Sequence, residues 1–258
     1  MDSCTHKRYD KHGFDSRKFS EHYFSNEDEK VYEDDTLKFP IECLTQTFEK
    51  GYIKGDTLID MSVGSLVHHL YVPCEFFKTI IVLKARDRCI LELKRWVNTR
   101  TGAFDWGHIT ELHSQIGGIS DQNKEEKVRS AINHVMKFNL CKENIVDPIV
   151  LPQADCIITA WLLDAICKDH NDFIKNLKKI TAMLKPGGYL LFFGCKNMTY
   201  YTVGKDKLHA FPYDEEMTKN ALVADGFVID DCRVHERTAV DDLCNFKAIT
   251  FILAHKEK

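Results

Sequence analysis

The sequence lacks any hydrophobic run long enough to cross a bilayer. Its longest apolar stretches, such as 189–193, have the length of a β-strand, whereas a membrane helix needs about 20 apolar residues. The N-terminal stretch MDSCTHKRYDKHGFD is polar and has no apolar core of a signal peptide. No repeat and no low-complexity linker divides the chain. We therefore expect a cytoplasmic protein that contacts no membrane.

The ten cysteines lack the spacing of a metal or disulfide motif. They are scattered singly, with no CxxC pair and no His/Cys cluster at zinc spacing. Several lie inside apolar runs, where a free cysteine behaves as a small hydrophobic residue. We expect reduced, structural thiols and no metal site.

Clustered positive charge is also missing. The net charge is −4, and no basic stripe interleaved with aromatic residues occurs, so nucleic-acid binding has little electrostatic support. The acidic stretch 25–35 reads as a solvated helix face or loop, and it would repel an anionic membrane surface. The expected partner is a small molecule, and nothing in the sequence demands more than a monomer.

What the sequence does contain is the alternation of an α/β protein. Its 258 residues, 44% hydrophobic and 29% charged, suit one such domain. Apolar runs predict strands at 58–60, 79–83, 155–161, 189–193, 227–234 and 247–255. Apolar residues at helical spacing predict a helix that begins at Asp87 as N-cap and helices over 125–138, 172–184 and 214–224.

Fully apolar strands between helices predict a mostly parallel sheet with helices on both faces. A polar loop joins the last two strands, which suggests a C-terminal antiparallel pair. Residues 1–50 are mainly helical and stand outside the alternation, so we expect an N-terminal lid over a single folding unit, 51–258. Ligands bind beyond the carboxyl ends of such strands, which places the site at 60–69, 83–89, 139–140 and the end of 155–161.

The stretch TLIDMSVGSLVHHL, residues 57–70, has the pattern of a strand-to-helix turn that holds a nucleotide-type cofactor. An apolar strand ends at Asp60 and an apolar pattern resumes after Gly64. Such turns usually carry two or three glycines, and this one has a single glycine. The turn is therefore the first place where ligand binding is in question.

Several motifs extend this pattern over nearly the whole chain: LIDMSVGS, LELKRWV, GAFDW, KEEKVRSAINHVMK, ADCIITAWLLDAIC, LKPGGYLLF and YYTVG. With them the chain resembles the nicotinamide, indolethylamine and phenylethanolamine N-methyltransferases, class I enzymes that use S-adenosylmethionine. LKPGG is common to many methyltransferases, whereas GAFDW and the KEEK helix are much more specific to this family. The resemblance implies a Rossmann-like, seven-stranded sheet and N-methylation of a small amine or pyridine.

The resemblance also implies a set of cofactor-contacting positions. They are Phe19, Tyr23, Phe24, Ser62, Val63, Gly64, His68, Lys84, Cys89, Asn139, Leu140 and Ala160. Ser62 stands where the family has its first glycine, which adds a Cβ and costs about 1–2 kcal/mol if the backbone is left-handed there. Lys84 stands where the family places an aspartate that accepts hydrogen bonds from both ribose hydroxyls, and an ammonium group can only donate.

On the substrate side, the resemblance implies contacts from Asp164, Tyr201, Met198 and Ala210. Met198 and Ala210 replace two serines of the nicotinamide pocket, so nicotinamide itself is a doubtful substrate. A family aspartate after the fifth strand corresponds to Gly194. Asp164 either pairs with a cationic amine or caps a helix.

Three functional hypotheses follow. Methyl transfer depends mainly on positioning, so the chain is an active N-methyltransferase if the cofactor still binds. If Ser62 and Lys84 together cost roughly 3–5 kcal/mol, affinity falls about a hundredfold to several thousandfold, which favours an inactive paralogue that binds or regulates. In the third, Lys84, Arg86, Arg88 and the pair His68–His69 form a new anion site. The alternative to this third hypothesis is a solvated basic turn beside an emptied pocket.

Overall fold

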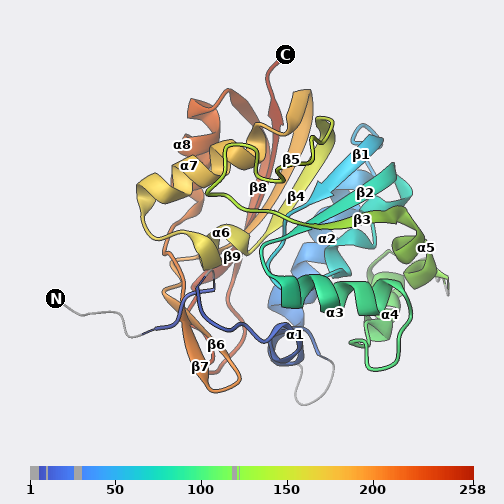
Figure 1. Cartoon of the computed structure of the whole chain (residues 1–258), viewed down its shortest axis with the longest axis vertical. Coiled ribbons are helices and arrows are strands. Elements are labelled where there is room, and N and C mark those ends of the chain that lie inside the picture. Colours follow the sequence, from blue (N-terminus) through green and yellow to red (C-terminus); the bar gives the residue numbers. More distant parts are fainter. Residues whose placement is uncertain (1–5, 10, 26–30, 118–120, 122) are drawn as a thin grey trace.

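The computed structural model describes the chain except residues 1–5, 10, 26–30, 118–120 and 122. Its centre is a seven-stranded sheet in the order β3-β2-β1-β4-β5-β9-β8 (Figure 1). These strands are β1 (Gly55–Asp60), β2 (Phe77–Lys84), β3 (Ile132–Lys137), β4 (Ala154–Ala160), β5 (Leu184–Lys196), β8 (Phe227–Glu236) and β9 (Ala248–Lys256). The first five run parallel, and β9 is antiparallel to both β5 and β8. The expected fold, with its C-terminal antiparallel pair, is confirmed.

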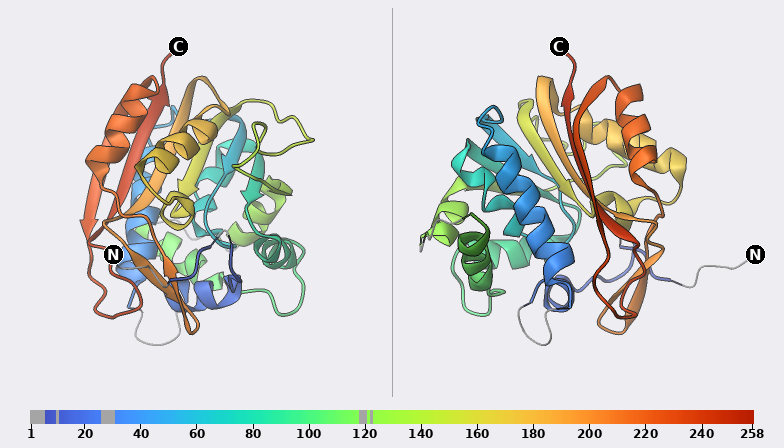
Figure 2. Two further views of the ribbon diagram at one scale, coloured as in Figure 1. Left: turned by 60° about the vertical axis from the view of Figure 1, so that its left-hand side comes forward. Right: turned by 180° about the vertical axis from the view of Figure 1, so that it is seen from behind.

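Helices cover both faces of this sheet. α2 lies across the face seen from behind, while α3, α6 and α7 lie on the face of Figure 1 (Figure 2). The helices are α1 (Ser16–Phe24), α2 (Phe39–Phe48), α3 (Asp87–Val97), α4 (Gly107–Gly117), α5 (Lys124–Ala131), α6 (Leu162–Ile166), α7 (His170–Thr181) and α8 (Glu215–Ala224). A π-helical turn, η1 (Glu33–Lys38), precedes α2, and two short 3-10 turns, η2 (His68–Leu70) and η3 (Pro73–Glu75), precede β2.

The carboxyl ends of the parallel strands are covered by the N-terminal segment, α1 and a separate hairpin (Figure 1). This hairpin pairs β6 (Tyr200–Val203) with β7 (Asp206–His209). Lys7 bonds to it through its backbone nitrogen and the Lys207 oxygen at 2.9 Å. The edge of the sheet where ligands bind in this fold class therefore lies under residues from both ends of the sequence.

Two sequence expectations are wrong in this region. The helix expected over 125–138 ends at Ala131, and Ile132 begins β3, which pairs in parallel with β2. Its apolar spacing fits a helix, but a short run of this kind does not distinguish a helix from a strand, and pairing with β2 decides the outcome. The turn after β1 is followed by the 3-10 turns and by no α-helix.

Helix ends follow local capping chemistry. Asp214 caps α8 by accepting from the Met217 backbone nitrogen. The N-cap of α3 is Arg86, one residue before the expected Asp87, and it makes no side-chain cap bond. α7 begins at His170 because the Asp169 side chain accepts from the Asp172 nitrogen, two residues before the expected start.

Every cysteine in the described part of the chain is a free thiol, as expected. A search of the same residues found no helix long and apolar enough to span a bilayer. It also found no group of His, Cys, Asp or Glu side chains arranged to hold a metal ion.

Candidate functional site: a closed turn and a buried carboxylate pocket

The turn after β1 remains bound to β4. The backbone nitrogens of Met61 and Val63 donate to the Ile158 and Ala160 oxygens at 2.8 and 3.0 Å. Gly64 alone in this turn adopts a positive φ, +61°, and a Cβ there would come within 3.1 Å of the Phe19 ring. Ser62 is not left-handed, so the backbone strain considered for it is absent. The glycine that this turn requires is Gly64.

Four side chains of β1, β2 and the turn form a buried polar cluster. Asp60 accepts from the Lys84 ammonium at 3.0 Å and from the Ser62 hydroxyl at 2.6 Å, and the His69 Nε2 lies 2.7 Å from the same carboxylate. Lys84 also donates to the Ser62 backbone oxygen at 3.0 Å. Asp60, His69 and Lys84 are each 0% exposed. Burial raises the pKa of Asp60, but Lys84 and His69 outweigh it and hold the pKa well below its usual range.

This cluster decides where Lys84 points. Its ammonium is directed inward, between two strands, and has no contact with solvent. The expected solvated basic turn is therefore wrong at Lys84. The proposed anion site is wrong for Lys84 and for the pair His68–His69, because all three side chains are 0% exposed.

Tyr9 closes the turn from outside, and sequence reasoning missed it. Its side chain is 0% exposed, its hydroxyl lies 3.7 Å from the Cys89 sulfur, and it also lies against the Gly64 backbone. The ring packs edge-on against Phe14 with centroids 4.7 Å apart. Nothing around position 9 signals this role in the sequence, because the segment is polar and stands outside the aromatic motif that follows it.

His68 sits in an aromatic cluster behind the turn. Its ring stacks between Trp106 and Trp161 at centroid distances of 5.9 and 5.8 Å, and Phe24 lies 4.9 Å away. Neither ring nitrogen has a hydrogen-bond partner among the described residues. Burial lowers the pKa of His68 well below its ordinary value, so the ring is neutral. It is a packing residue, the more common role for a histidine at this place.

A small apolar cavity lies beside the turn. Its volume is about 50 Å³, and it has room for roughly four water-sized atoms. Seven of the expected site residues line it together: Phe19, Tyr23, Phe24, Val63, Asp164, Met198 and Tyr201. The expected cofactor and substrate positions therefore meet at one cavity, which we call the carboxylate pocket.

Asp164 is the charged group of the carboxylate pocket. Its Oδ1 accepts from the Cys195 backbone nitrogen and its Oδ2 from the Tyr213 hydroxyl, both at 2.8 Å. No Lys or Arg pairs with it in the described part of the chain. Burial raises the pKa of Asp164 to about 7. Trp161, not Asp164, is the N-cap of α6, so the capping role considered for Asp164 is wrong.

Gly194 makes the Asp164–Tyr213 contact possible. A Cβ at Gly194 would collide with the Tyr213 hydroxyl, so the aspartate that the resemblance places here has no room. Tyr213 was not expected in the site, since it lies outside every quoted motif. The carboxylate pocket therefore has one acid held by a tyrosine.

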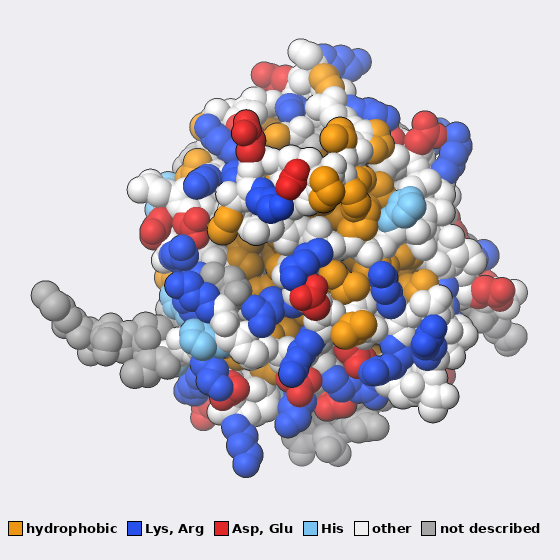
Figure 3. All heavy atoms as spheres, viewed as in Figure 1, with side chains coloured by type: hydrophobic (Ala, Val, Ile, Leu, Met, Phe, Trp, Pro, Cys, Tyr) orange, Lys and Arg blue, Asp and Glu red, His pale blue; other side chains and the backbone are white. Residues whose placement is uncertain are grey.

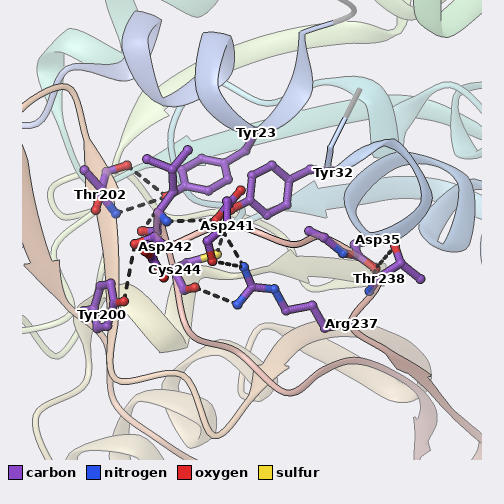
Figure 4. Close-up of polar contacts among 12 residues, drawn as sticks. Tyr23, Tyr32, Asp35, Tyr200, Thr202, Arg237, Thr238, Asp241, Asp242 and Cys244 are labelled. Atoms are coloured by element: carbon purple, nitrogen blue, oxygen red, sulfur yellow. Dashed lines mark hydrogen bonds and ion pairs between the residues drawn. The ribbon is translucent and has the colours of Figure 1, made fainter. Parts of the chain in front are cut away.

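The outer wall of the carboxylate pocket is fixed by polar contacts between the N-terminal region and the loop before β9 (Figure 4). The Tyr32 hydroxyl donates to the Asp241 carboxylate, and Tyr23 donates to the Thr202 backbone oxygen at 2.9 Å. Asp35, 0% exposed, accepts from the backbone nitrogens of Thr238 and Ala239 at 2.9 Å each. These bonds hold α1 and η1 against the pocket.

The remaining expected residues are spread over the same edge of the sheet. Cys89 and Ala160 are buried beside the turn, and Ala210 is buried but does not line the carboxylate pocket. Asn139 and Leu140 line a separate, open groove at the ends of β2 and β3. The structure thus divides the expected site into a closed interior and an outer groove.

The model of the NNMT/PNMT/TEMT family matches residues 3–257. The chain belongs to this family. Indolethylamine N-methyltransferase of Oryctolagus cuniculus is 30% identical and covers 96% of this chain and 95% of that protein. The nicotinamide N-methyltransferase of Homo sapiens is 29% identical over 94% of this chain and 93% of that protein. The phenylethanolamine N-methyltransferase of Homo sapiens is 32% identical over 84% of this chain and 79% of that protein.

Solved structures place the fold in the same class. Magnesium protoporphyrin IX methyltransferase from Synechocystis with bound S-adenosylhomocysteine has a TM-score of 0.56 at 11% identity and covers 93% of both chains. A S-adenosylmethionine-dependent methyltransferase from Clostridium acetobutylicum has a TM-score of 0.56 at 14% identity, over 93% of this chain and 98% of that one. At such identities the likeness shows the fold alone. Family and fold together support S-adenosylmethionine-dependent N-methylation as the reaction class of this family.

The side chains at the turn do not fit the way in which the family is expected to hold S-adenosylmethionine. Lys84, at the position where the resemblance implies a ribose contact, has no acceptor atom, and its ammonium group donates to Asp60 and to the Ser62 backbone oxygen. Tyr9 fills the space between Gly64 and Cys89, and the carboxylate pocket of about 50 Å³ is far smaller than the ligand pockets of 300–1,000 Å³ that proteins commonly present.

Proposed function

We propose that this member of the family binds a small cationic amine in the carboxylate pocket and does not transfer a methyl group. The observation that carries the proposal is the buried ion pair between Lys84 and Asp60. It stands where the family's ribose-binding carboxylate is expected. To admit a nucleoside in the family's mode, the pair would have to separate inside the protein, and a broken buried pair costs about 3–5 kcal/mol.

Asp164 supports the amine as ligand. A buried carboxylate without a cationic partner is costly, and its raised pKa of about 7 reflects that cost. An ammonium group would supply the missing charge, while the apolar walls would contact its carbon atoms. Uncharged nicotinamide would supply no cation, and its amide would find Met198 and Ala210 where the family's hydroxyl groups are expected.

The amine proposal has a defined pH dependence. Bound ammonium favours the Asp164 carboxylate, so binding below about pH 7 requires Asp164 to lose a proton first. Affinity should therefore fall as the pH drops below 7. Its buried titratable neighbours are Tyr213, whose pKa is raised well above its ordinary value by burial and by Asp164, and Cys195, whose thiol pKa burial also raises. Both side chains stay neutral around pH 7, so the pH dependence of amine affinity arises from Asp164.

Family membership favours a second candidate, an active N-methyltransferase of a small amine or pyridine. Its support is the match over residues 3–257, with relatives that are N-methyltransferases at 29–32% identity. For this candidate, Lys84 and Tyr9 must leave their places when the cofactor binds.

Calorimetry separates the two candidates. The wild-type chain is titrated with S-adenosylhomocysteine, and separately with a panel of short aliphatic amines at pH 6 and pH 8. We expect no saturable heat from S-adenosylhomocysteine, and we expect amine binding that is stronger at pH 8 and lost in D164N. Micromolar binding of S-adenosylhomocysteine would contradict the proposed loss of cofactor binding. Amine affinity that is unchanged in D164N would overturn the assigned pocket.

A further inference from the structure

Aromatic side chains make up much of the wall of the carboxylate pocket. They come from α1, from the residue after β4, from β6 and from the loop before β9: Phe19, Tyr23, Phe24, Trp161, Tyr201 and Phe246. The rings are tilted against one another, and the centroid of Phe19 lies 5.3 Å from that of Tyr23 and 6.1 Å from that of Tyr201. The pocket therefore offers ring faces and ring edges to a ligand.

The same wall exposes no oxygen or nitrogen atom to the cavity in the part of the chain that the structure describes. Its surface is apolar throughout, although Asp164 lies in the wall. Each Asp164 oxygen already accepts a hydrogen bond at 2.8 Å, one from the Cys195 nitrogen and one from the Tyr213 hydroxyl. Asp164 thus acts on the cavity through its charge, which is weakly screened in such surroundings, and not as a hydrogen-bond partner.

These two features disfavour a primary ammonium group as the ligand. Its N–H groups bond to water in solution, and an apolar wall returns none of those bonds. A quaternary ammonium group has no N–H group, and its methyl groups carry the positive charge against the faces of aromatic rings. Tetramethylammonium, a nitrogen with four carbon atoms, is close in size to a cavity of about 50 Å³, which has room for roughly four water-sized atoms.

We propose that the carboxylate pocket selects a small quaternary ammonium group, held against the rings of Phe19 and Tyr201 and attracted by the charge of Asp164. This inference rests on the proposed function, and it narrows the ligand from amines in general to a cation without N–H groups. A quaternary nitrogen has no lone pair and cannot accept a methyl group. Such a ligand is therefore bound by the protein and is not a substrate for methyl transfer.

The selection arises inside the pocket. Figure 3 shows Lys and Arg side chains gathered over the region of α1 and α3, so the charge of that surface does not attract a cation. Arg237, in the outer wall, is paired with Asp241 at 3.1 Å. Among the described residues, Asp164 is the only charged side chain that lines the cavity. Recognition of a cation there depends on this carboxylate and on the rings.

The test is calorimetric titration of the full chain at pH 8 with methylammonium, with tetramethylammonium and with tert-butanol, an uncharged molecule of similar size. We expect tetramethylammonium to bind about tenfold more tightly than either of the other two, and D164N to lose this binding.

Two substitutions at one position test the ring contact. Y201L removes the ring and should weaken tetramethylammonium about fivefold, whereas Y201F keeps the ring and should bind it as the wild type does. F76L, which removes a ring outside the carboxylate pocket, is the matched control and should leave the affinity unchanged. Urea unfolding of each variant shows that it is folded at the temperature of the titration.

The outcomes separate this inference from the proposed function. Methylammonium that binds as tightly as tetramethylammonium, with both lost in D164N, would contradict the quaternary ligand and leave the amine site in place. If neither cation binds, or if tert-butanol binds as tightly as tetramethylammonium, both the inference and the proposed amine site are wrong. Equal weakening of tetramethylammonium by Y201L and Y201F would refute the ring contact.

Discussion

Lys84 is tolerated without solvent contact because the Asp60 carboxylate and the Ser62 backbone oxygen accept hydrogen bonds from its ammonium group. A buried ion pair is weak support for stability as a whole, since desolvation offsets most of its attraction, but the loss of one partner is costly. The ammonium group of Lys84, at the end of β2, is thus neutralised by Asp60 inside the protein.

K84M tests this pairing. The variant leaves the Asp60 carboxylate buried without its ammonium partner, so we expect the free energy of unfolding to fall by about 3–5 kcal/mol in urea titrations. The double variant D60N/K84M removes both charges and should recover most of the loss. K84M as stable as the wild type would contradict the buried pair.

Asp164 makes stability depend on pH. Its pKa is raised from 3.8 to about 7 in the folded chain, so between these values the folded state holds a proton that the unfolded state has lost. The stability contributed by this proton is fully present below pH 4 and is lost as the pH rises to 7, a change of about 4 kcal/mol at about 1.4 kcal/mol per pH unit. Unfolding free energies of wild type and D164N, measured from pH 4 to 8, should diverge by this amount. Parallel curves would contradict the raised pKa.

At the scale of single elements, η2 places two adjacent histidines in different environments. His69 reaches the Asp60 carboxylate, whereas His68 lies among aromatic rings without a hydrogen-bond partner for either ring nitrogen among the described residues. A buried polar group without a partner costs about 1–3 kcal/mol. The same short turn therefore contains one stabilising and one destabilising imidazole.

H68F should raise the free energy of unfolding by about 1–2 kcal/mol, because phenylalanine keeps the stacking and removes the unpaired nitrogens. H69F is the matched control, and it should lower stability because it removes a partner of Asp60. Thermal and urea unfolding measure both. A destabilised H68F would mean that a partner for His68 exists in solution.

Within residues 1–50, the expected lid, α1 and η1 are held by hydrogen bonds that the Asp35 carboxylate accepts. D35N keeps the size of the side chain but weakens its bonds to Thr238 and Ala239, so stability should fall by about 1–3 kcal/mol. Amide hydrogen exchange in α1 and η1 should become faster, while exchange in β4 and β5 changes less. D34N, at an exposed neighbouring position, is the control. Equal exchange in D35N and wild type would show that these bonds do not hold α1 and η1.

At the scale of the whole molecule, the sheet was predictable from the sequence, whereas the closed turn after β1 was not. The central parts of β4 and β5 are apolar runs, which only a sheet covered on both faces buries completely. β3 was missed because its apolar spacing continues that of α5. The lysine at position 84 was visible in the sequence, yet its inward direction depends on its contact with Asp60 on the neighbouring strand. Tyr9 and Tyr213 reach the site from distant segments that carry no motif.

The fold and the ligand contacts of this protein depend on different residues. Sheet order and helix packing depend on the apolar runs, which form the strands at the centre of the sheet. Ligand contacts depend on a few positions at the ends of strands. Lys84, Ser62 and Gly194, where the resemblance implies other residues, lie at such positions and set the charge and space at the edge of the sheet.

The most direct test of the closed turn is a crystal of the wild-type chain soaked with S-adenosylhomocysteine. We predict no ligand density between Gly64 and Cys89, with the Lys84 ammonium still bound to Asp60 and Tyr9 still in place. A nucleoside at full occupancy beside β2, with Lys84 turned outward, would contradict the account.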